Sequence, residues 1–540
     1  MNVVLYDTTL RDGTQGEGVQ LSVEDKLAIA QLADDIGVSF IEGGWPGSNP
    51  RDEAFFQQAA KLRLKHAKIA AFGSTRRSGI KCEQDANLDA LLRTEVPCVT
   101  IVGKSWHFHV TEALRIGLEE NLDLIEDSVR FLRARVSDVV FDAEHFFDGY
   151  KEDPAYALSC LRAATDGGAT YLALCDTNGG SLPTEIEAAV AAVKQALGER
   201  VGVGIHTHND SELAVANTLA AVRAGASMVQ GTINGCGERC GNANLVSIIP
   251  ALRLKMGIEC VTAAQLAQLR HVSRTVDEIS NRAPWTSQPY VGQSAFAHKG
   301  GLHVDAIKKN SKTYEHIDPE LVGNHRRILL SDLSGRANLE LKAKELGLEL
   351  DPKSPEARKI LDTLKQLEAD GYQFESAGAS FKLFMLESLG KRPRYFTLRD
   401  LEVQIAFAES EASKDATRVR IEIGVGDEAA YTSARGDGPV HAMDVGLRSL
   451  IDRFYPQLQS VRLVDYKVRV LSSSVGTGSV VRVLIQSSDG EEVWGTVGVS
   501  PNIIHASWSA MVDALEYKLV KDGVEPFAGV SSSAQPSAPM

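Results

Sequence analysis

Two histidines separated by one residue are the first groups in this sequence with the spacing of metal ligands. His206 and His208 follow the short run Val201–Ile205. On an extended strand, residues i and i+2 point to the same side, so both imidazoles can approach one cation. A lone histidine on a strand is more often structural, but this pair at a strand end favours metal ligation. The sequence therefore predicts a metal site at this point.

Two other side chains with suitable oxygen atoms follow predicted strands. Asp12 comes after the run Val3–Tyr6, and Asn242 ends a glycine-rich loop after Met228–Gly231. Together with the two histidines they offer a carboxylate, two imidazoles and an amide oxygen. This set suits Mn²⁺, Mg²⁺ or Zn²⁺ without selecting among them, and it leaves positions open for substrate. A cation held there can chelate an α-keto acid.

Arg11 and Thr177 can contact such a substrate. Arg11 precedes Asp12, and the pair can be either a structural salt bridge or a group that stabilises negative charge on the keto oxygen. Thr177 follows the predicted strand Tyr171–Leu174, and its hydroxyl can donate to the substrate carboxylate.

The elements that must position these residues repeat along the first 260 residues. Short apolar runs alternate with amphipathic segments such as Val23–Ile36 and Leu118–Ala134. Repeated βα units predict a parallel sheet, and eight of them favour an α/β fold of the (β/α)8 TIM-barrel type. A doubly wound sheet is the alternative, although no Rossmann fingerprint follows the first strand. The eight predicted strands are Val3–Tyr6, Ser39–Glu42, Lys68–Phe72, Cys98–Val102, Asp138–Phe141, Tyr171–Leu174, Val201–Ile205 and Met228–Gly231.

The rest of the chain changes in character twice. Residues 266–394 follow a barrel predicted at 1–265 and have the pattern of helical linker subdomains. Residues 395–527 are rich in predicted strands and contain an internal repeat, in which Thr432 and Thr496, like two His-Ala pairs, are offset by 64 residues. An α+β domain with a two-fold repeat is expected there. Residues 528–540 are rich in Ser, Pro and Ala and are expected to be disordered.

Composition excludes several classes of protein. The 540 residues carry 57 Lys and Arg against 71 Asp and Glu, a net charge of −14, and 44% are hydrophobic. A disordered chain, a membrane protein and a broad nucleic-acid surface are therefore not expected. The N-terminus does not have the pattern of a signal peptide, and seven sparse cysteines suggest reduced thiols, so a cytoplasmic protein is expected. Cys236 and Cys240 are more typical of ordinary thiols than of half a zinc site.

Three stretches resemble a known enzyme family. Leu10–Gln15 with Lys26, His206–Asp210 and Gly235–Asn242 are similar to the signatures of the 2-isopropylmalate, homocitrate and citramalate synthases. The C-terminal repeat resembles the allosteric domain of this family, so the resemblance covers nearly the whole chain. Glu212 departs from the second signature, where Gly is more usual, and this puts the start of the following helix in doubt.

The resemblance implies a metal-dependent acyltransferase. Ile41–Asp52, Lys104–Leu114 and Phe141–Tyr150 are most similar to the branch that condenses acetyl-CoA with pyruvate to citramalate and CoA, the first step of a threonine-independent route to isoleucine. By similarity, the metal ligands are Asp12, His206, His208 and Asn242; Arg11 polarises the keto oxygen and Thr177 contacts the carboxylate. The catalytic residues implied in addition are Glu144, His303 and Tyr314. A homodimer is implied, in which His303 acts on the partner's barrel, as is feedback inhibition by isoleucine or leucine through the C-terminal domain.

The sequence is also compatible with other functions. Within the family, the acceptor could be 2-oxoisovalerate or 2-oxoglutarate, as in 2-isopropylmalate and homocitrate synthases. A metal-dependent lyase on the same barrel shares the Arg-Asp start and the two histidines, but a minimal lyase lacks the His298–His303 region and the repeat. An inactive regulatory protein is a third possibility, which the complete set of candidate residues disfavours.

Overall fold

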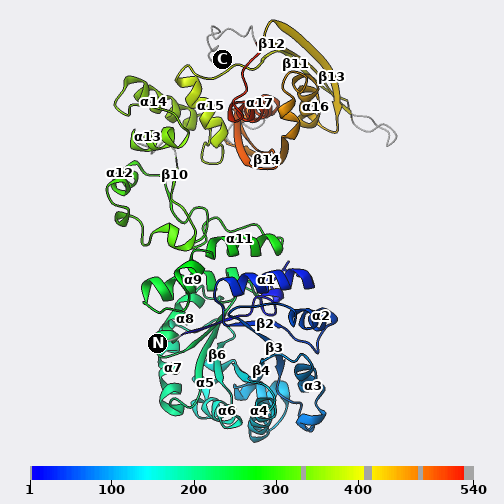
Figure 1. Ribbon diagram of the computed structural model, residues 1–540, viewed down its shortest axis with the longest axis vertical. Coiled ribbons are helices and arrows are strands. Elements are labelled where there is room, and N and C mark those ends of the chain that lie inside the picture. The colour runs from blue at the N-terminus through cyan, green and yellow to red at the C-terminus, as the bar shows by residue number, and fades with distance from the viewer. Residues whose placement is uncertain (1–2, 330–335, 407–415, 472–477, 528–540) are drawn as a thin grey trace. The chain divides into compact units, whose positions relative to one another are not determined.

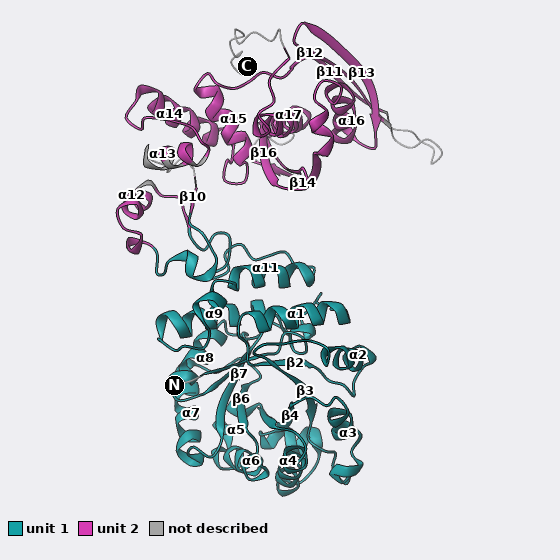
Figure 2. Ribbon diagram, in the orientation of Figure 1, with its two compact units in different colours: residues 1–296, 315–326 teal, residues 297–314, 327–540 magenta. Residues whose placement is uncertain are grey.

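The computed structural model describes residues 3–329, 336–406, 416–471 and 478–527 in two compact units. The first unit consists of residues 1–296 and 315–326, and the second of residues 297–314 and 327–540 (Figure 2). The division of the chain at residues 265 and 394 remains a prediction. The tail predicted to be disordered, residues 528–540, lies outside the described residues.

Eight parallel strands form a closed barrel in the first unit, as the sequence predicts (Figure 1). β1 pairs with both β2 and β8, so the doubly wound alternative is wrong. Most of the strands run one to three residues beyond their predicted ends. The strands are β1 (Val4–Asp7), β2 (Phe40–Gly44), β3 (Lys68–Ser74), β4 (Cys98–Lys104), β5 (Asp138–Glu144), β6 (Tyr171–Asp176), β7 (Gly202–Thr207) and β8 (Met228–Gly231).

The alternation of side chains along these strands builds the barrel interior in layers. One apolar layer takes a buried residue from each of seven strands: Tyr6, Phe40, Ala70, Cys98, Val140, Ala173 and Met228. Because every second residue of a strand points inward, the residues two positions further along each strand form the next layer. That layer is polar, and its members include Glu42, Thr100, Asp142 and Gln230, all buried. Polar groups therefore start inside the barrel and continue toward the carboxyl ends of the strands.

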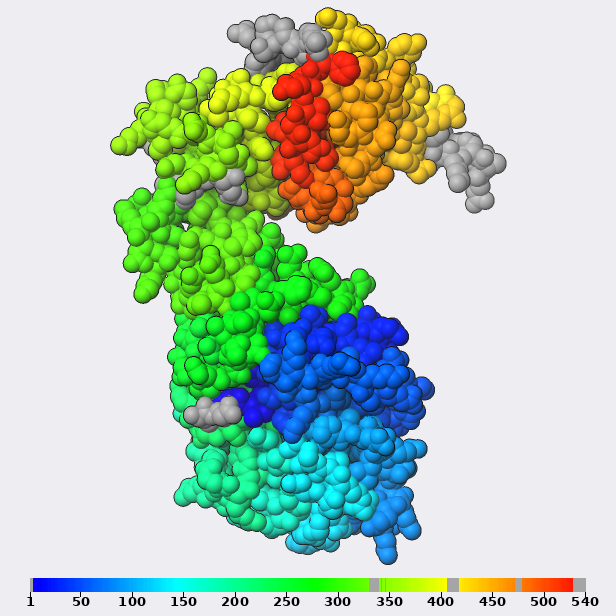
Figure 3. All heavy atoms as spheres, viewed as in Figure 1, coloured from blue at the N-terminus to red at the C-terminus, as the bar shows by residue number. Residues whose placement is uncertain are grey.

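Helices surround the barrel, and their starts are marked by side-chain caps. Ser22 accepts from the amide of Asp25 and forms a capping box at α1, and Asp153 caps α6. Figures 1 and 3 show α1 beside α11, although about 230 residues separate them in the sequence. No helix among the described residues is both long and apolar enough to span a membrane. The helices of this unit are α1 (Val23–Asp35), α2 (Pro50–Ala59), α3 (Ala86–Arg93), α4 (Leu118–Arg133), α5 (Phe146–Glu152), α6 (Pro154–Gly167), α7 (Pro183–Leu197), α8 (Ala214–Arg223), α9 (Leu245–Pro250), α10 (Ala263–Leu266) and α11 (Leu269–Ile279).

The second unit confirms the internal repeat. Two antiparallel three-stranded sheets, β11-β12-β13 and β14-β15-β16, are followed by α16 and α17 respectively. Ile421 pairs with Thr432 in the first sheet, and Ile485 pairs with Thr496 in the second, so the 64-residue offset holds at the level of strand register. The elements are β9 (Ala297–His298), α12 (Gly301–Lys309), β10 (Arg327–Ile328), α13 (Arg336–Glu345), α14 (Pro355–Ala369), α15 (Gly378–Ser388), β11 (Thr397–Ala406), β12 (Ala416–Val425), β13 (Glu428–Gly436), α16 (Pro439–Ile451), β14 (Arg462–Val470), β15 (Val481–Ser488), β16 (Val493–Ser500) and α17 (Ile503–Lys521).

Candidate active site

A cavity of about 600 Å³ lies at the carboxyl ends of the strands. Its lining includes six of the residues singled out in the sequence: Arg11, Asp12, Glu144, Thr177, His206 and His208. Glu144 and Thr177 lie four residues beyond Val140 and Ala173 of the apolar layer. They therefore share the inward phase of the strand pattern, which is why residues distant in sequence meet in one cavity.

Asp12, His206 and His208 form a buried cluster whose ligand atoms all lie within 4.8 Å of one another. The Nε2 atoms of the two histidines are 3.3 Å apart, and His206 Nε2 is also 3.3 Å from Asp12 Oδ2. Two imidazole nitrogens and a carboxylate oxygen at these separations are the donor set of a divalent-cation site. The residues present therefore fit a divalent metal ion.

Asn242 lies against this cluster through its amide nitrogen. Its Nδ2 donates to Asp12 Oδ2 at 2.6 Å, while its Oδ1 is buried without a hydrogen-bond partner among the described residues. A Cβ atom on Gly237 would collide with that oxygen, so any other residue at this position would displace the Asn242 amide. A buried amide oxygen without a partner is costly, and a cation would satisfy it. The predicted role of Asn242 as a fourth ligand remains a prediction.

The charges in the cluster favour a neutral His208. Burial, together with the neighbouring His206, lowers the pKa of His208 to about 3, so its imidazole is unprotonated at neutral pH. Burial acts in the same direction on His206, but the hydrogen bond and charge of Asp12 outweigh it and raise the pKa of His206. Burial opposes ionisation of Asp12, yet the charge of Arg11 holds its pKa well below the usual range. An ionised carboxylate and a free imidazole lone pair are what metal binding requires.

A hydrogen-bond chain across the barrel interior fixes the tautomer of His206. Gln230 donates its Nε2 to Asp142 Oδ1 at 2.8 Å, which leaves its Oε1 to accept from His206 Nδ1 at 2.7 Å. Neutral His206 therefore keeps its proton on Nδ1, and a cation that displaces the Nε2 proton facing Asp12 would find the lone pair of Nε2 in the cluster. Gln230 was not predicted from the sequence, although a glutamine among apolar strand residues indicates a need for buried hydrogen-bond partners.

Arg11 is held on three sides. Its Nε donates to the buried Glu42, its Nη1 lies 3.1 Å from Asp12 Oδ1, and its guanidinium stacks 3.9 Å from the centre of the Phe72 ring. Glu42 accepts a further hydrogen bond from Tyr6 at 2.8 Å. Arg11 thus makes a salt bridge and also lines the cavity, so the two interpretations of the Arg-Asp pair do not exclude each other. Glu42 was not recognised as a site residue in the sequence.

Glu144 and Thr177 each have one partner that orients them. Lys104, at the end of β4, forms an ion pair with Glu144 within the cavity. Thr177 Oγ1 accepts from the backbone amide of His145 at 2.9 Å, so its own proton is free to donate. His145 adopts a left-handed conformation with φ 54°, which is unusual for a residue with a side chain. Lys104 lines the cavity and, like Gln230 and Glu42, was not predicted from the sequence.

His303 and Tyr314 belong to the second unit. His303 lies in α12, and its ring stacks on that of Tyr314 with centroids 4.0 Å apart. Their predicted catalytic roles remain predictions.

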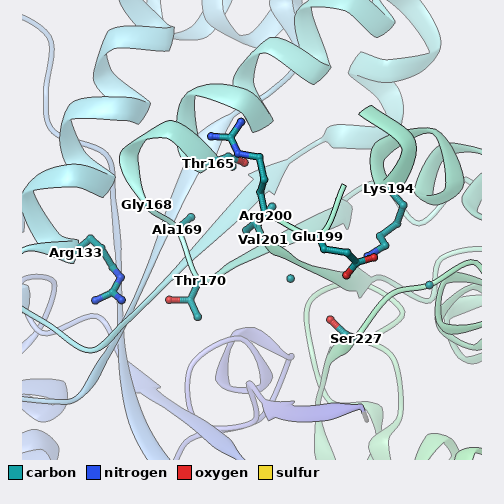
Figure 4. A pocket seen from close by; sticks show the side chains of 12 residues that line it. Arg133, Thr165, Gly168, Ala169, Thr170, Lys194, Glu199, Arg200, Val201 and Ser227 are labelled. Atoms are coloured by element: carbon teal, nitrogen blue, oxygen red, sulfur yellow. The ribbon is translucent and has the colours of Figure 1, made fainter. Parts of the chain in front are cut away.

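A second hollow, of about 750 Å³, opens at the amino ends of the strands (Figure 4). Its three cations all have local partners: Lys194 pairs with Glu199 at 2.9 Å, Arg200 with Asp166 at 2.7 Å, and Arg133 donates to the carbonyl of Val136. In barrels of this class, chemistry takes place at the carboxyl ends, and this end contributes to stability.

Comparison with known proteins gives matches over nearly the whole chain. A family model described as HMGL-like matches residues 2–276, a homocitrate synthase post-HMGL domain-like model matches 290–371, and a LeuA allosteric (dimerisation) domain model matches 375–519. The chain is 52% identical over 523 residues to (R)-citramalate synthase of Aquifex aeolicus (strain VF5), covering 97% of this chain and 99% of that protein. It is 54% identical over 519 residues to (R)-citramalate synthase of Geobacter sulfurreducens, covering 96% and 98%. Identity to 2-isopropylmalate synthase of Halalkalibacterium halodurans is 30% over 517 residues, covering 95% and 96%.

Proposed function

The chain belongs to the (R)-citramalate synthases of the HMGL-like family, and from that premise we propose which of its residues carry out the condensation of acetyl-CoA with pyruvate. The acyl group is converted to an alkyl group on transfer, because the acetyl methyl carbon forms the new bond to the keto carbon of pyruvate. Hydrolysis of the thioester then releases CoA and (R)-citramalate.

Pyruvate binds at the cluster formed by Asp12, His206 and His208. A divalent cation bound there, Mn²⁺ or Mg²⁺ or else Zn²⁺, supplies a Lewis acid for the carboxylate and keto oxygens. Asn242 completes the ligand set. Arg11 faces the same cavity and stabilises the negative charge that develops on the keto oxygen. Thr177 donates its free hydroxyl proton to the substrate carboxylate.

His303 removes the proton from the acetyl methyl group, and Glu144 serves as the catalytic carboxylate of the barrel. Histidine suits the first role because an unprotonated imidazole can accept a proton and later release it. The ring of Tyr314 stacks on His303 and restricts its orientation. Lys104 fixes the carboxylate of Glu144 in the cavity. By family resemblance the protein acts as a homodimer, and His303 serves the barrel of the partner subunit.

The observation that carries this proposal is the meeting of the metal cluster, Arg11 and Glu144 in a single cavity. The test is the release of CoA from acetyl-CoA with pyruvate, 2-oxoisovalerate and 2-oxoglutarate as acceptors, in the presence of Mn²⁺, Mg²⁺ or Zn²⁺. We expect the highest kcat/KM with pyruvate. A preference for either larger acid would identify another synthase of the family, and cleavage of a hydroxyacyl-CoA without condensation would identify a lyase.

The C-terminal repeat regulates the enzyme by binding isoleucine or leucine. The match of residues 375–519 to the LeuA allosteric (dimerisation) domain supports this role. Titration of the full chain with isoleucine, leucine and valine should show inhibition by one of the first two at concentrations where valine has little effect. Equal inhibition by all three amino acids would contradict a specific effector site.

A further inference from the structure

The catalytic cavity has a cationic wall that the reaction described above does not use. The segment between β3 and α3 lines the cavity through residues 74–78, which include Arg76 and Arg77. Arg76 also lines an adjoining hollow of about 530 Å³, whose other cations are Lys81, Arg130 and Arg135. That hollow holds four cations against two acidic residues, Glu83 and Asp127. This is a local excess of positive charge in a chain whose net charge is −14.

Two cations in this region have neither an ion pair nor a side-chain hydrogen bond among the described residues, whereas Arg135 donates to the carbonyl of Phe131. Arg76 is paired with Asp127 at 2.7 Å, and Arg130 is paired with Glu126 one helical turn away. The side chains of Arg77 and Lys81 are exposed and have no ion-pair or hydrogen-bond partner within the part of the chain that the structure describes. Exposed cations beside a cavity raise the local concentration of anionic ligands.

The backbone that carries these cations is held in place before any ligand arrives. The amide of Arg77 donates to Asp85 Oδ2 at 2.9 Å, and the other oxygen of Asp85 caps α3 by accepting from the amides of Asn87 and Leu88. The amide of Arg76 donates to Ser128 Oγ of α4 at 2.8 Å. The loop is therefore anchored to two helices, and little ordering is needed when its side chains bind an anion.

Two other parts of the cavity lining differ in chemistry from this cationic wall. One part contains the metal cluster, Arg11 and Glu144, and another part is apolar, with Phe72, Val102, Leu114, Ile116 and Leu124. An acyl-CoA has the same three chemistries: a reacting thioester, a largely aliphatic arm and a phosphorylated nucleotide. We propose that Arg76, Arg77 and Lys81, the β3–α3 basic cluster, bind the phosphate groups of the CoA part of the acyl donor. This inference rests on the proposed function.

Charge reversal on full-length protein tests the cluster. The variant is Arg77→Glu/Lys81→Glu, and Arg77→Gln/Lys81→Gln is a milder form. The control is Lys61→Glu/Arg63→Glu, which reverses two exposed cations without described partners in the segment that precedes the same strand, β3. Hydrogen bonds between charged groups contribute more binding free energy than neutral ones, and the variant loses them. KM for acetyl-CoA should therefore rise roughly 10- to 100-fold in the variant. KM for pyruvate and kcat should stay within about twofold of the wild type, and the control should resemble the wild type in all three values.

A donor without phosphates separates phosphate binding from other effects. S-acetylpantetheine keeps the thioester and the arm but lacks the nucleotide, so its kcat/KM should be equal in the wild type and the variant. Equal KM values for acetyl-CoA in the variant and the control would overturn the inference, as would a parallel loss with S-acetylpantetheine. Calorimetric titration with CoA itself measures the cluster without turnover. If the wild type fails to condense acetyl-CoA with pyruvate, the proposed function fails, while the CoA titration still decides whether the cluster binds phosphate.

Discussion

The two ends of the barrel carry hollows of similar size, but their polar groups are arranged differently. At the amino end, Lys194 and Arg133 are satisfied by partners close in sequence, and Arg200 is satisfied by Asp166 near the end of α6. At the carboxyl end, Asp12, His206 and His208 converge, and buried atoms such as Asn242 Oδ1 have no described partner. The larger hollow is therefore not the site. Convergent side chains with unmet bonding capacity distinguish a functional cavity from a gap between loops.

The backbone shows the same contrast around the two hollows. The loops that enter β6, β7 and β8 at the amino end turn through Gly168, Gly198 and Gly225, all with positive φ. At the carboxyl end, His145, Glu212 and Arg239 adopt positive φ with full side chains. Such residues cost conformational energy, and one of the three, Arg239, lines the cavity.

The largest difference between the two ends should appear on replacing an arginine. Arg11→Gln should lower kcat about 10²- to 10³-fold, because the charge that faces the keto oxygen is lost. Arg200→Gln at the amino end should leave kcat unchanged. Steady-state kinetics with acetyl-CoA and pyruvate measures both, and circular dichroism verifies that each variant is folded. A comparable loss in the two variants would remove the functional distinction between the ends.

The chain from Asp142 through Gln230 to His206 should affect metal affinity. Gln230→Leu removes the acceptor for His206 Nδ1 and should weaken Mn²⁺ binding about 10- to 100-fold, as loss of outer hydrogen-bond partners does at other metal sites. Gln230→Glu keeps an acceptor oxygen and should retain more of the affinity. Electron paramagnetic resonance of free Mn²⁺ gives the binding constant directly. Equal losses in the two variants would show that the hydrogen bond to His206 is not the cause.

The carboxyl end should also determine how stability depends on pH. Burial raises the pKa of Asp7 to about 7 although Thr9 donates to it. The folded protein therefore holds the proton more tightly than the unfolded chain does, whose aspartates titrate near pH ~3.9. The resulting stabilisation is complete below that value and is lost as pH rises toward 7. Between pH 5 and pH 8, the free energy of unfolding of Asp7→Asn should therefore fall by roughly 2 kcal/mol less than that of the wild type. Urea unfolding at the two pH values measures this difference. Ser227→Ala at the amino end removes no titratable group and should leave the pH profile as it is.

Introducing a glycine at the carboxyl end and replacing one at the amino end should have opposite effects on stability. Glu212→Gly relieves a left-handed residue at φ 59° and should stabilise the protein by about 0.5 to 1 kcal/mol. Gly198→Ala places a side chain at φ 63° and ψ −144°, a conformation nearly restricted to glycine. Nearby atoms leave space for the side chain, so the expected destabilisation of about 1 to 3 kcal/mol comes from the backbone alone. Thermal unfolding of the two variants gives both signs. Stabilisation by both substitutions would contradict the account of backbone strain.

The smallest effect is expected for the ion pair of the amino end. Arg200 and Asp166 are 62% and 50% exposed, and surface pairs of this kind contribute about 0–1 kcal/mol. Arg200→Ala should therefore change the free energy of unfolding by less than about 0.5 kcal/mol and leave the KM for acetyl-CoA unaltered. A rise in that KM would mean that the amino-end hollow takes part in binding.

The sequence predicted the barrel and the candidate ligands because both depend on local patterns. Short apolar runs locate the strands, and a polar residue after each run is placed at the carboxyl end by the parallel topology. The partners of these residues could not be predicted in the same way, because Gln230 and Asp142 are 88 residues apart and meet only through closure of the barrel. The strands also ended later than predicted, since polar residues such as Lys104 and Glu144 interrupt the apolar pattern while the hydrogen-bonded ladder continues. Glu212 adopts a positive φ, a conformation that favours glycine. This explains why Gly is more usual at that position of the family signature.

The Asp142–Gln230–His206 chain has a consequence for the order of events in folding. Its members come from β5, β8 and β7, and β8 is also the strand that pairs with β1 to close the barrel. Gln230 can orient His206 only after the final strand has docked. An intermediate that lacks β8 would leave the imidazole free to rotate and would bind a cation weakly. During refolding, the gain of tight metal binding should therefore coincide with ring closure, so that a bound ion reports the completion of the barrel.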